Sequence, residues 1–135
     1  MKNIDIQATK GEFFTPRVYM NAQTGECELS GESYIEDTLD FYRPILTWLS
    51  DYITQVKLPL KVTFNLQYYN TSSSKYLLDI IKLLKRAIDT DHDVKITWFV
   101  PKDDYDMLEE VEDYIRFVGI PIDIQQIWAD YLLAP

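Results

Sequence analysis

The sequence predicts a single-domain α/β fold over residues 1–135, with a mixed β-sheet and three main helices packed on it. Two observations favour this class. Segments with an apolar residue at every second position alternate along the chain with segments whose apolar residues recur every three or four positions. No internal repeat or Pro/Gly/Ser-rich linker divides the chain, and its 135 residues suit one hydrophobic core.

The first third of the chain predicts short strands. Residues 4–8 alternate between apolar and polar side chains, and residues 17–20 look extended after Pro16. Residues 21–25 supply turn chemistry before a second short strand at residues 27–29. We therefore expect an antiparallel hairpin in this region.

Three helices are expected where apolar side chains fall on one helical face. They cover about residues 40–56, 72–88 and 104–118. Pro44 places the start of the first helix near residue 40, since a missing amide donor costs little only in the first turn. Gly119 is a natural stop for the third helix.

The remaining strands are expected between these helices. Residues 60–66 alternate regularly, residues 94–100 form the next strand, and residues 122–124 begin a last strand or an extended tail. Strands separated by helices pair in parallel through right-handed crossovers. The hairpin and these crossovers together make the predicted sheet mixed.

The acidic composition of the chain argues against nonspecific binding to polyanions. Acidic residues outnumber basic ones 22 to 13, which gives a net charge of −9 and disfavours nonspecific binding to nucleic acids or anionic membranes. The chain shows no signal segment and no apolar run of membrane-spanning length. We therefore expect a cytoplasmic protein that inserts into no membrane.

Catalytic residues are scarce, so we expect no enzyme, no cofactor and no metal site. His92 is the only histidine and lies in a predicted loop, and the four glycines are too scattered to form a phosphate-binding loop.

Cys27 stands between Glu26 and Glu28, which disfavour its thiolate. The acidic residues 103–113 lack the spacing of a calcium loop and are interpreted as a solvated helix whose first residues, Asp103 or Asp104, cap it.

The run from Asn70 to Ser74 is the strongest functional candidate. It follows a regular strand and opens the second helix, at the strand end where open α/β sheets place their sites. One polar residue is enough to cap a helix, and this run has five. A phosphorylated hydroxyl here would add a charge of about −1.5 to −2 beside the helix terminus. Two alternatives remain: a small anion- or ligand-binding pocket, or a structural adaptor in which Thr71 is a plain cap.

Several segments in order along the chain resemble the SiaC family of bacterial regulatory phosphoproteins. The matching residues are Tyr68–Ser73, Thr15-Pro16, Gly31–Tyr34, Phe41-Tyr42, Pro44, Trp48-Leu49, Trp98 and Asp103–Met107. Ile35, Asp37 and Val111 depart from the family pattern, which has Pro, Asn and Gly there. These departures concern the partner surface and leave the hydroxyl run intact.

The resemblance implies a fold similar to STAS domains and a role in partner switching. It places the phosphoacceptor on Thr71, with Ser72 and Ser73 as competing acceptors. The partners it implies are a Ser/Thr kinase of histidine-kinase-like fold, a phosphatase of the PP2C type and a diguanylate cyclase. The unmodified protein would activate the cyclase, and so cyclic di-GMP synthesis and biofilm formation. The expected partner-binding residues are Tyr69, Asn70, Thr71, Ser72, Ser73 and Lys75.

Overall fold

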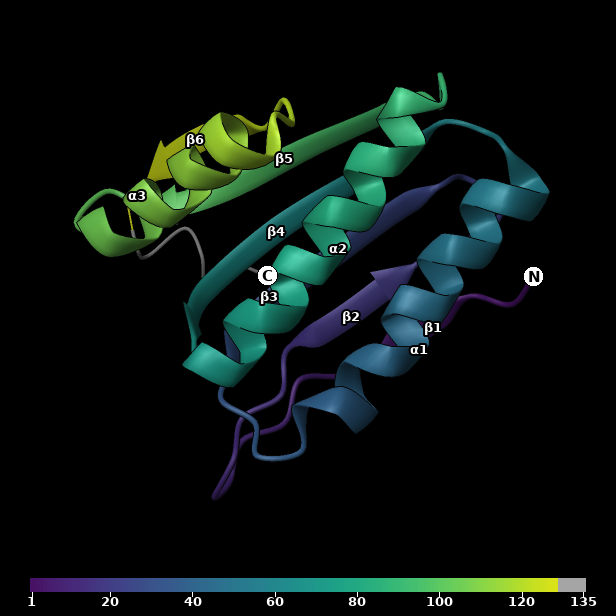
Figure 1. The fold of residues 1–135 in the computed structure, drawn as a ribbon. Coiled ribbons are helices and arrows are strands. Elements are labelled where there is room, and N and C mark those ends of the chain that lie inside the picture. Colours follow the sequence, from purple (N-terminus) through teal and green to yellow (C-terminus); the bar gives the residue numbers. More distant parts are fainter. Residues whose placement is uncertain (129–135) are drawn as a thin grey trace.

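The computed structural model describes residues 1–128 and forms one six-stranded sheet in the order β1-β2-β3-β4-β5-β6 (Figure 1). The strands are β1 (Ile4–Ile6), β2 (Arg17–Met20), β3 (Glu26–Ser33), β4 (Leu60–Tyr69), β5 (Val94–Pro101) and β6 (Asp123–Ile127). The first three pair antiparallel, and β3 to β6 pair in parallel. The predicted mixed α/β sheet is confirmed; residues 129–135 of the expected domain lie outside the described residues.

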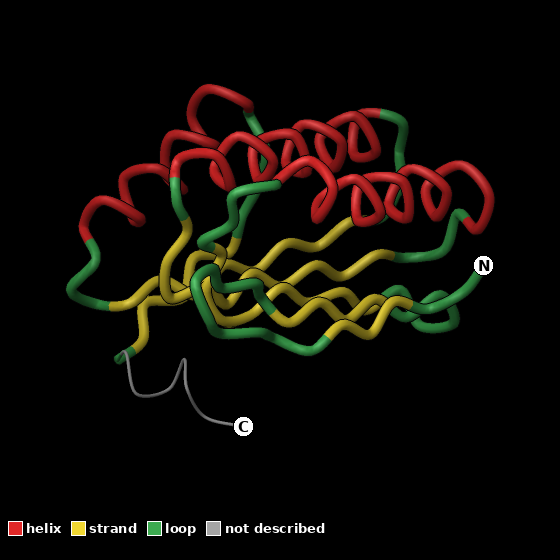
Figure 2. Tube along the Cα trace, turned by 90° about the horizontal axis from the view of Figure 1, so that it is seen from below, coloured by secondary structure: helices red, strands yellow, loops and turns green. Residues whose placement is uncertain are grey.

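The three helices cover one face of the sheet, as Figure 2 shows. They are α1 (Thr38–Asp51), α2 (Thr71–Asp89) and α3 (Tyr105–Asp113). Each connects two neighbouring parallel strands, and right-handed crossovers between strands in chain order all return on the same side. Among residues 1–128, no helix lies on the opposite face of the sheet. Within residues 1–128, none of the helices is both long and apolar enough to cross a bilayer.

The predicted helix boundaries need correction at three points. α1 begins at Thr38, so Pro44 lies in the second turn and not the first. α1 and α3 both end in a π-helical turn, at Tyr52–Val56 and Tyr114–Val118, where regular α-helix was expected. The stop at Gly119 is confirmed, with a left-handed φ of 77°. A single π-turn is too short to leave an apolar repeat of its own in the sequence, so the spacing does not predict it.

The hydrophobic core lies between the helices and the sheet. Phe64 of β4 stacks on Trp98 of β5, with ring centroids 4.2 Å apart. The other wholly buried large side chains come from all these layers: Tyr42, Tyr52, Met20, Leu29, Ile45, Leu49, Leu60, Leu66, Leu77 and Ile80. α1 and α2 lie side by side over the sheet, with α1 on the side of β1 and β2 and α2 over β3 and β4 (Figure 1).

A β-bulge near the end of β4 reverses the direction of its last side chains. The pairing of β3 with β4 shifts by one residue between Gly31 and Glu32. A one-residue shift exchanges the two faces of a strand. Tyr69 therefore points to the helix side, 6.3 Å from the Trp98 ring, and Tyr68 is 50% exposed. The bulge brings one tyrosine of this pair beneath α3 and leaves the other at the surface.

Gly25 provides a test of the fold. Its φ is 77°, and an added Cβ would collide with the Pro59 carbonyl oxygen and lie 2.7 Å from the Tyr52 hydroxyl. Gly25→Ala should therefore destabilise the protein by about 2–5 kcal/mol, from backbone strain and overpacking together. Gly11→Ala is the matched control, because the nearest atom to its Cβ is 4.0 Å away. Urea unfolding of both variants makes the comparison, and equal stabilities would contradict this packing.

Candidate functional site

The hydroxyl run lies at the first turn of α2, directly after the carboxyl end of β4. Asn70 is the N-cap, and its Oδ1 accepts a hydrogen bond of 3.0 Å from the Ser73 amide. Its Nδ2 donates to the Ile35 carbonyl oxygen at 3.1 Å, and its backbone amide donates to the Ser33 carbonyl at 2.9 Å. Because Asn70 is the cap, the alternative in which Thr71 caps the helix is wrong.

Ser73 is fully buried and belongs to a chain of hydroxyl groups that joins three elements. Tyr42 of α1 lies 2.7 Å from Ser33 of β3, measured between hydroxyl oxygens. The Ser33 hydroxyl donates to Ser73 Oγ at 2.8 Å, and the Ser73 hydroxyl donates to Asn70 Oδ1 at 2.5 Å. Since the Ser33 proton goes to Ser73, Tyr42 is the donor to Ser33. Buried hydroxyls that all find partners fix the start of α2 against the sheet.

Ser74 contacts α3 instead. Its hydroxyl donates to Glu110 Oε1 at 2.5 Å, and the Tyr114 hydroxyl donates to the same oxygen at 2.8 Å. The Tyr69 hydroxyl donates to Glu110 Oε2 at 3.0 Å. Burial and the nearby Glu110 carboxylate both raise the pKa of Tyr69 and of Tyr114, so both stay protonated donors.

Thr71 and Ser72 are the exposed hydroxyl residues of the run. Ser72 Oγ lies 3.3 Å from both the Ile35 carbonyl oxygen and Asn70 Oδ1. Thr71 is the first residue of α2, and among the described residues its hydroxyl has no hydrogen-bond partner. Lys75, one turn further, is also exposed. The structure thus brings Thr71, Ser72 and Lys75 to the surface, leaves Tyr69 and Asn70 half-buried, and buries Ser73.

The other sequence candidates lie away from this turn. His92 is in the loop before β5, where its Nε2 lies 2.8 Å from the Leu58 carbonyl oxygen. Burial raises the pKa of the Cys27 thiol to about 12, so desolvation, and not the acidic neighbours, is what suppresses its thiolate.

Asp104 caps α3 as expected, accepting from the Met107 amide at 3.0 Å. Within residues 1–128, no three His, Cys, Asp or Glu side chains are grouped as metal ligands.

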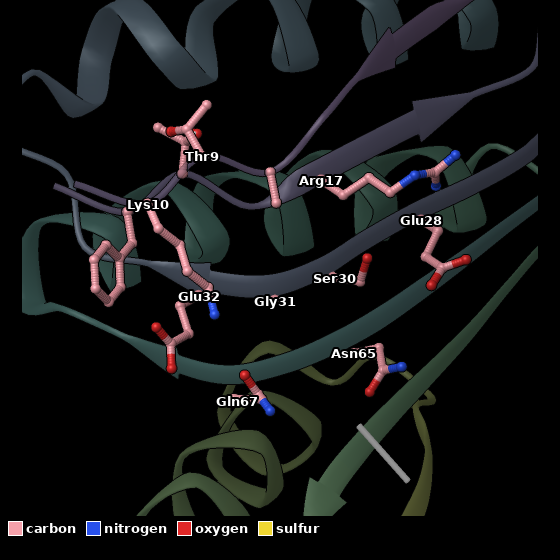
Figure 3. A pocket seen from close by; sticks show the side chains of 12 residues that line it. Thr9, Lys10, Arg17, Glu28, Ser30, Gly31, Glu32, Asn65 and Gln67 are labelled. Atoms are coloured by element: carbon pink, nitrogen blue, oxygen red, sulfur yellow. The ribbon is translucent and has the colours of Figure 1, made fainter. Parts of the chain in front are cut away.

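Two hollows bear on the ligand-binding alternative. One of about 260 Å³ lies on the open face of the sheet, where Lys10, Arg17, Glu28 and Glu32 line it together with Asn65 (Figure 3). It mixes both signs of charge and lies on the side of the sheet opposite α2.

The second hollow, of about 300 Å³, lies beside the hydroxyl run. Tyr68, Tyr69, Asp104, Asp106, Met107 and Glu110 line it. Its three carboxylates disfavour an anion, so the geometry gives no support to an anion pocket at this junction.

Sequence reasoning missed Ser33, Tyr42, Ile35 and Glu110 as parts of the site. Ser33 and Ile35 lie far from Asn70 in the chain and meet it only because β3 and β4 are neighbours. Glu110 is one of several acids on α3, and nothing in their spacing marks it. Tyr42 is a buried core residue of α1, and its hydroxyl makes the polar contact with Ser33.

The hydroxyl chain predicts a non-additive response to mutation. Ser33→Ala leaves the Tyr42 hydroxyl buried without an acceptor and should cost about 1–3 kcal/mol. Tyr42→Phe should cost about 1 kcal/mol alone. The double variant should lose less than the sum, because the orphaned hydroxyl is then absent. Urea unfolding measures all three, with the exposed Ser50→Ala of α1 as a control; strict additivity would show that these hydroxyls are not coupled.

The buried hydroxyl of Tyr42 predicts a loss of stability at alkaline pH. Burial raises the pKa of Tyr42 from its ordinary 10 to about 12. Between these values the unfolded chain loses the proton first, so the free energy of unfolding falls as pH rises from 10 towards 12, whereas below pH 10 this contribution is fully present. The free energy of unfolding of the Tyr42→Phe variant should fall less steeply than that of the wild type over this pH interval, as measured by urea unfolding at several pH values. Equal slopes would mean that Tyr42 does not titrate in this way.

Comparison with known proteins shows the family to which this chain is similar. A family model described as "SiaC family regulatory phosphoprotein" matches residues 6–127. An uncharacterized protein of Pseudomonas aeruginosa strain UCBPP-PA14 is 26% identical over 125 residues, which cover 93% of this chain and 97% of that protein.

Solved structures match over nearly the whole chain. The crystal structure of apo-SiaC from Pseudomonas aeruginosa is 27% identical, with a TM-score of 0.82 over 93% of this chain and 99% of that one. A chain in the crystal structure of the P. aeruginosa diguanylate cyclase SiaD in complex with its activator SiaC is 25% identical, with a TM-score of 0.80 over 90% of this chain and 100% of that one. The chain described here belongs to the SiaC family of regulatory phosphoproteins.

Proposed function

We propose that this protein is a non-enzymatic partner switch controlled by phosphorylation of Thr71. The unmodified form binds and activates a diguanylate cyclase in the cytoplasm, and so promotes cyclic di-GMP synthesis and biofilm formation; the phosphorylated form is released. The observation that carries the proposal is the exposed Thr71 hydroxyl, free of partners among residues 1–128, on the first residue of a firmly anchored helix. Family membership supports it, as does the relative described as the activator of SiaD.

The enzymes that set the phosphorylation state are separate proteins in this proposal. A Ser/Thr kinase of histidine-kinase-like fold transfers the phosphoryl group to Thr71, and a phosphatase of the PP2C type removes it. An acceptor on the first residue of a helix suits both enzymes, because the hydroxyl is reachable without unfolding α2. Ser73 is fully buried, so it is neither a proposed phosphoacceptor nor a proposed partner contact.

The switch works through desolvation. The proposed partner surface comprises Thr71 and its exposed neighbours Ser72 and Lys75, with Asn70 and Tyr69 half-buried behind them. Phosphorylation adds a charge of about −1.5 to −2 at its centre. Removing that charge from water against a cyclase surface without matched donors costs several kcal/mol, and about 1.4 kcal/mol is already tenfold in affinity. One phosphate is therefore sufficient to separate the two proteins.

Substitution of Thr71 tests this function directly. Thr71→Ala should abolish modification by the kinase and ATP yet leave activation of the cyclase within about twofold, because it removes only an exposed hydroxyl. Thr71→Glu should weaken cyclase activation at least about tenfold, by the desolvation cost of its carboxylate. Phosphopeptide mass spectrometry and the rate of cyclic di-GMP synthesis by the purified cyclase of the same organism are the measurements.

Ser72→Ala is the matched control, since Ser72 is the neighbouring exposed hydroxyl. It should acquire phosphate at Thr71 like the wild type, which assigns the modification to Thr71 and not to its neighbour. A Thr71→Glu protein that activates normally, or a wild type that acquires no phosphate at Thr71, would refute the proposal.

A further inference from the structure

The carboxylate of Glu110 is held in a fixed position against one hydroxyl of the α2 turn. Ser74 Oγ lies 2.5 Å from Glu110 Oε1. The Tyr114 hydroxyl donates to the same oxygen at 2.8 Å, and the Tyr69 hydroxyl donates to Oε2 at 3.0 Å. Hydrogen bonds to both carboxylate oxygens prevent the group from rotating away from Ser74 without losing partners.

Ser74 differs from the other hydroxyls of the run in this respect. Ser73 is excluded from modification by complete burial. Ser74 is only half-buried, so burial alone does not exclude it, and it lies one helical turn from Thr71 on the same side of α2. A kinase that reaches Thr71 therefore finds a second hydroxyl close by.

We propose that Glu110 is a specificity-determining residue that bars phosphorylation of Ser74 and so confines transfer to Thr71. The inference rests on the proposed function, because it concerns the same kinase. Transfer from ATP forms a bond between the hydroxyl oxygen and the γ-phosphorus and breaks the bond from that phosphorus to the β-phosphate oxygen. ADP leaves, and the hydroxyl proton passes to a base of the kinase.

Charge makes this transfer unfavourable at Ser74. A phosphoryl group on Ser74 Oγ would place its negative oxygens beside the Glu110 carboxylate, which its hydrogen bonds hold in position. Like charges in such a partly buried site repel strongly. The Ser74 proton also stabilises the carboxylate, so its removal leaves Glu110 with one donor fewer. Among the described residues no Lys or Arg forms an ion pair with Glu110 to offset either cost.

The first test maps phosphorylation in a Thr71→Ala background. With the purified kinase and ATP, Thr71→Ala/Glu110→Gln should gain at least about tenfold more phosphate at Ser74 than Thr71→Ala alone, measured by phosphopeptide mass spectrometry. Gln removes the charge and keeps one of the two acceptor oxygens, while its NH2 group replaces the other. Thr71→Ala/Glu109→Gln is the matched control, because Glu109 is exposed, and it should gain none.

The second test needs no kinase. Ser74→Asp should lower the folding equilibrium constant at least about tenfold more in the wild type than in Glu110→Gln, as measured by urea unfolding. Equal effects in the two backgrounds, or no gain of Ser74 phosphate in Thr71→Ala/Glu110→Gln while the wild type is modified at Thr71, would overturn the role of Glu110. A wild type without phosphate at Thr71 would instead refute the proposed function, and the unfolding cycle would still decide whether Glu110 repels charge at Ser74.

Discussion

The buried hydrogen bonds from Tyr42 through Ser33 and Ser73 to Asn70 are the constraint on which the proposed regulatory site depends. They join α1, β3 and the first turn of α2, so the helix terminus is fixed by the core and not by its surface residues. A rigid terminus matters for a switch that works by charge. In the proposed switch, the phosphate changes the charge that a partner meets at Thr71, while the fold that presents it stays the same.

One short polar run thereby acquires several distinct roles. Asn70 caps the helix, Ser73 forms hydrogen bonds in the interior, and Ser74 donates to the Glu110 carboxylate of α3. Among the described residues, Thr71 stands out as the residue of the run whose hydroxyl forms no hydrogen bond. A helix needs one cap, and in our proposal the additional hydroxyls of this run divide between anchoring the helix and regulation.

The order of strands and helices followed from periodicity, because each apolar pattern matches one face of one element. Periodicity failed where a local irregularity changes the face. Continued alternation from Leu66 would bury Tyr68 and expose Tyr69, and the bulge in β4 does the opposite. The place of the hydroxyl run at the start of the second helix was likewise predictable, but the contacts that hold it there were not. Ser33 and Glu110 reach the α2 turn from distant parts of the chain, and one sequence does not reveal such contacts.

The measurement that tests the central claim most directly is the affinity of the cyclase for two forms of the native protein, unmodified and stoichiometrically phosphorylated at Thr71. Isothermal titration calorimetry with the purified cyclase of the same organism gives both dissociation constants. Our account predicts that the phosphorylated form binds at least about tenfold more weakly, since a desolvated dianion costs more than 1.4 kcal/mol. Equal affinities for the two forms would contradict it.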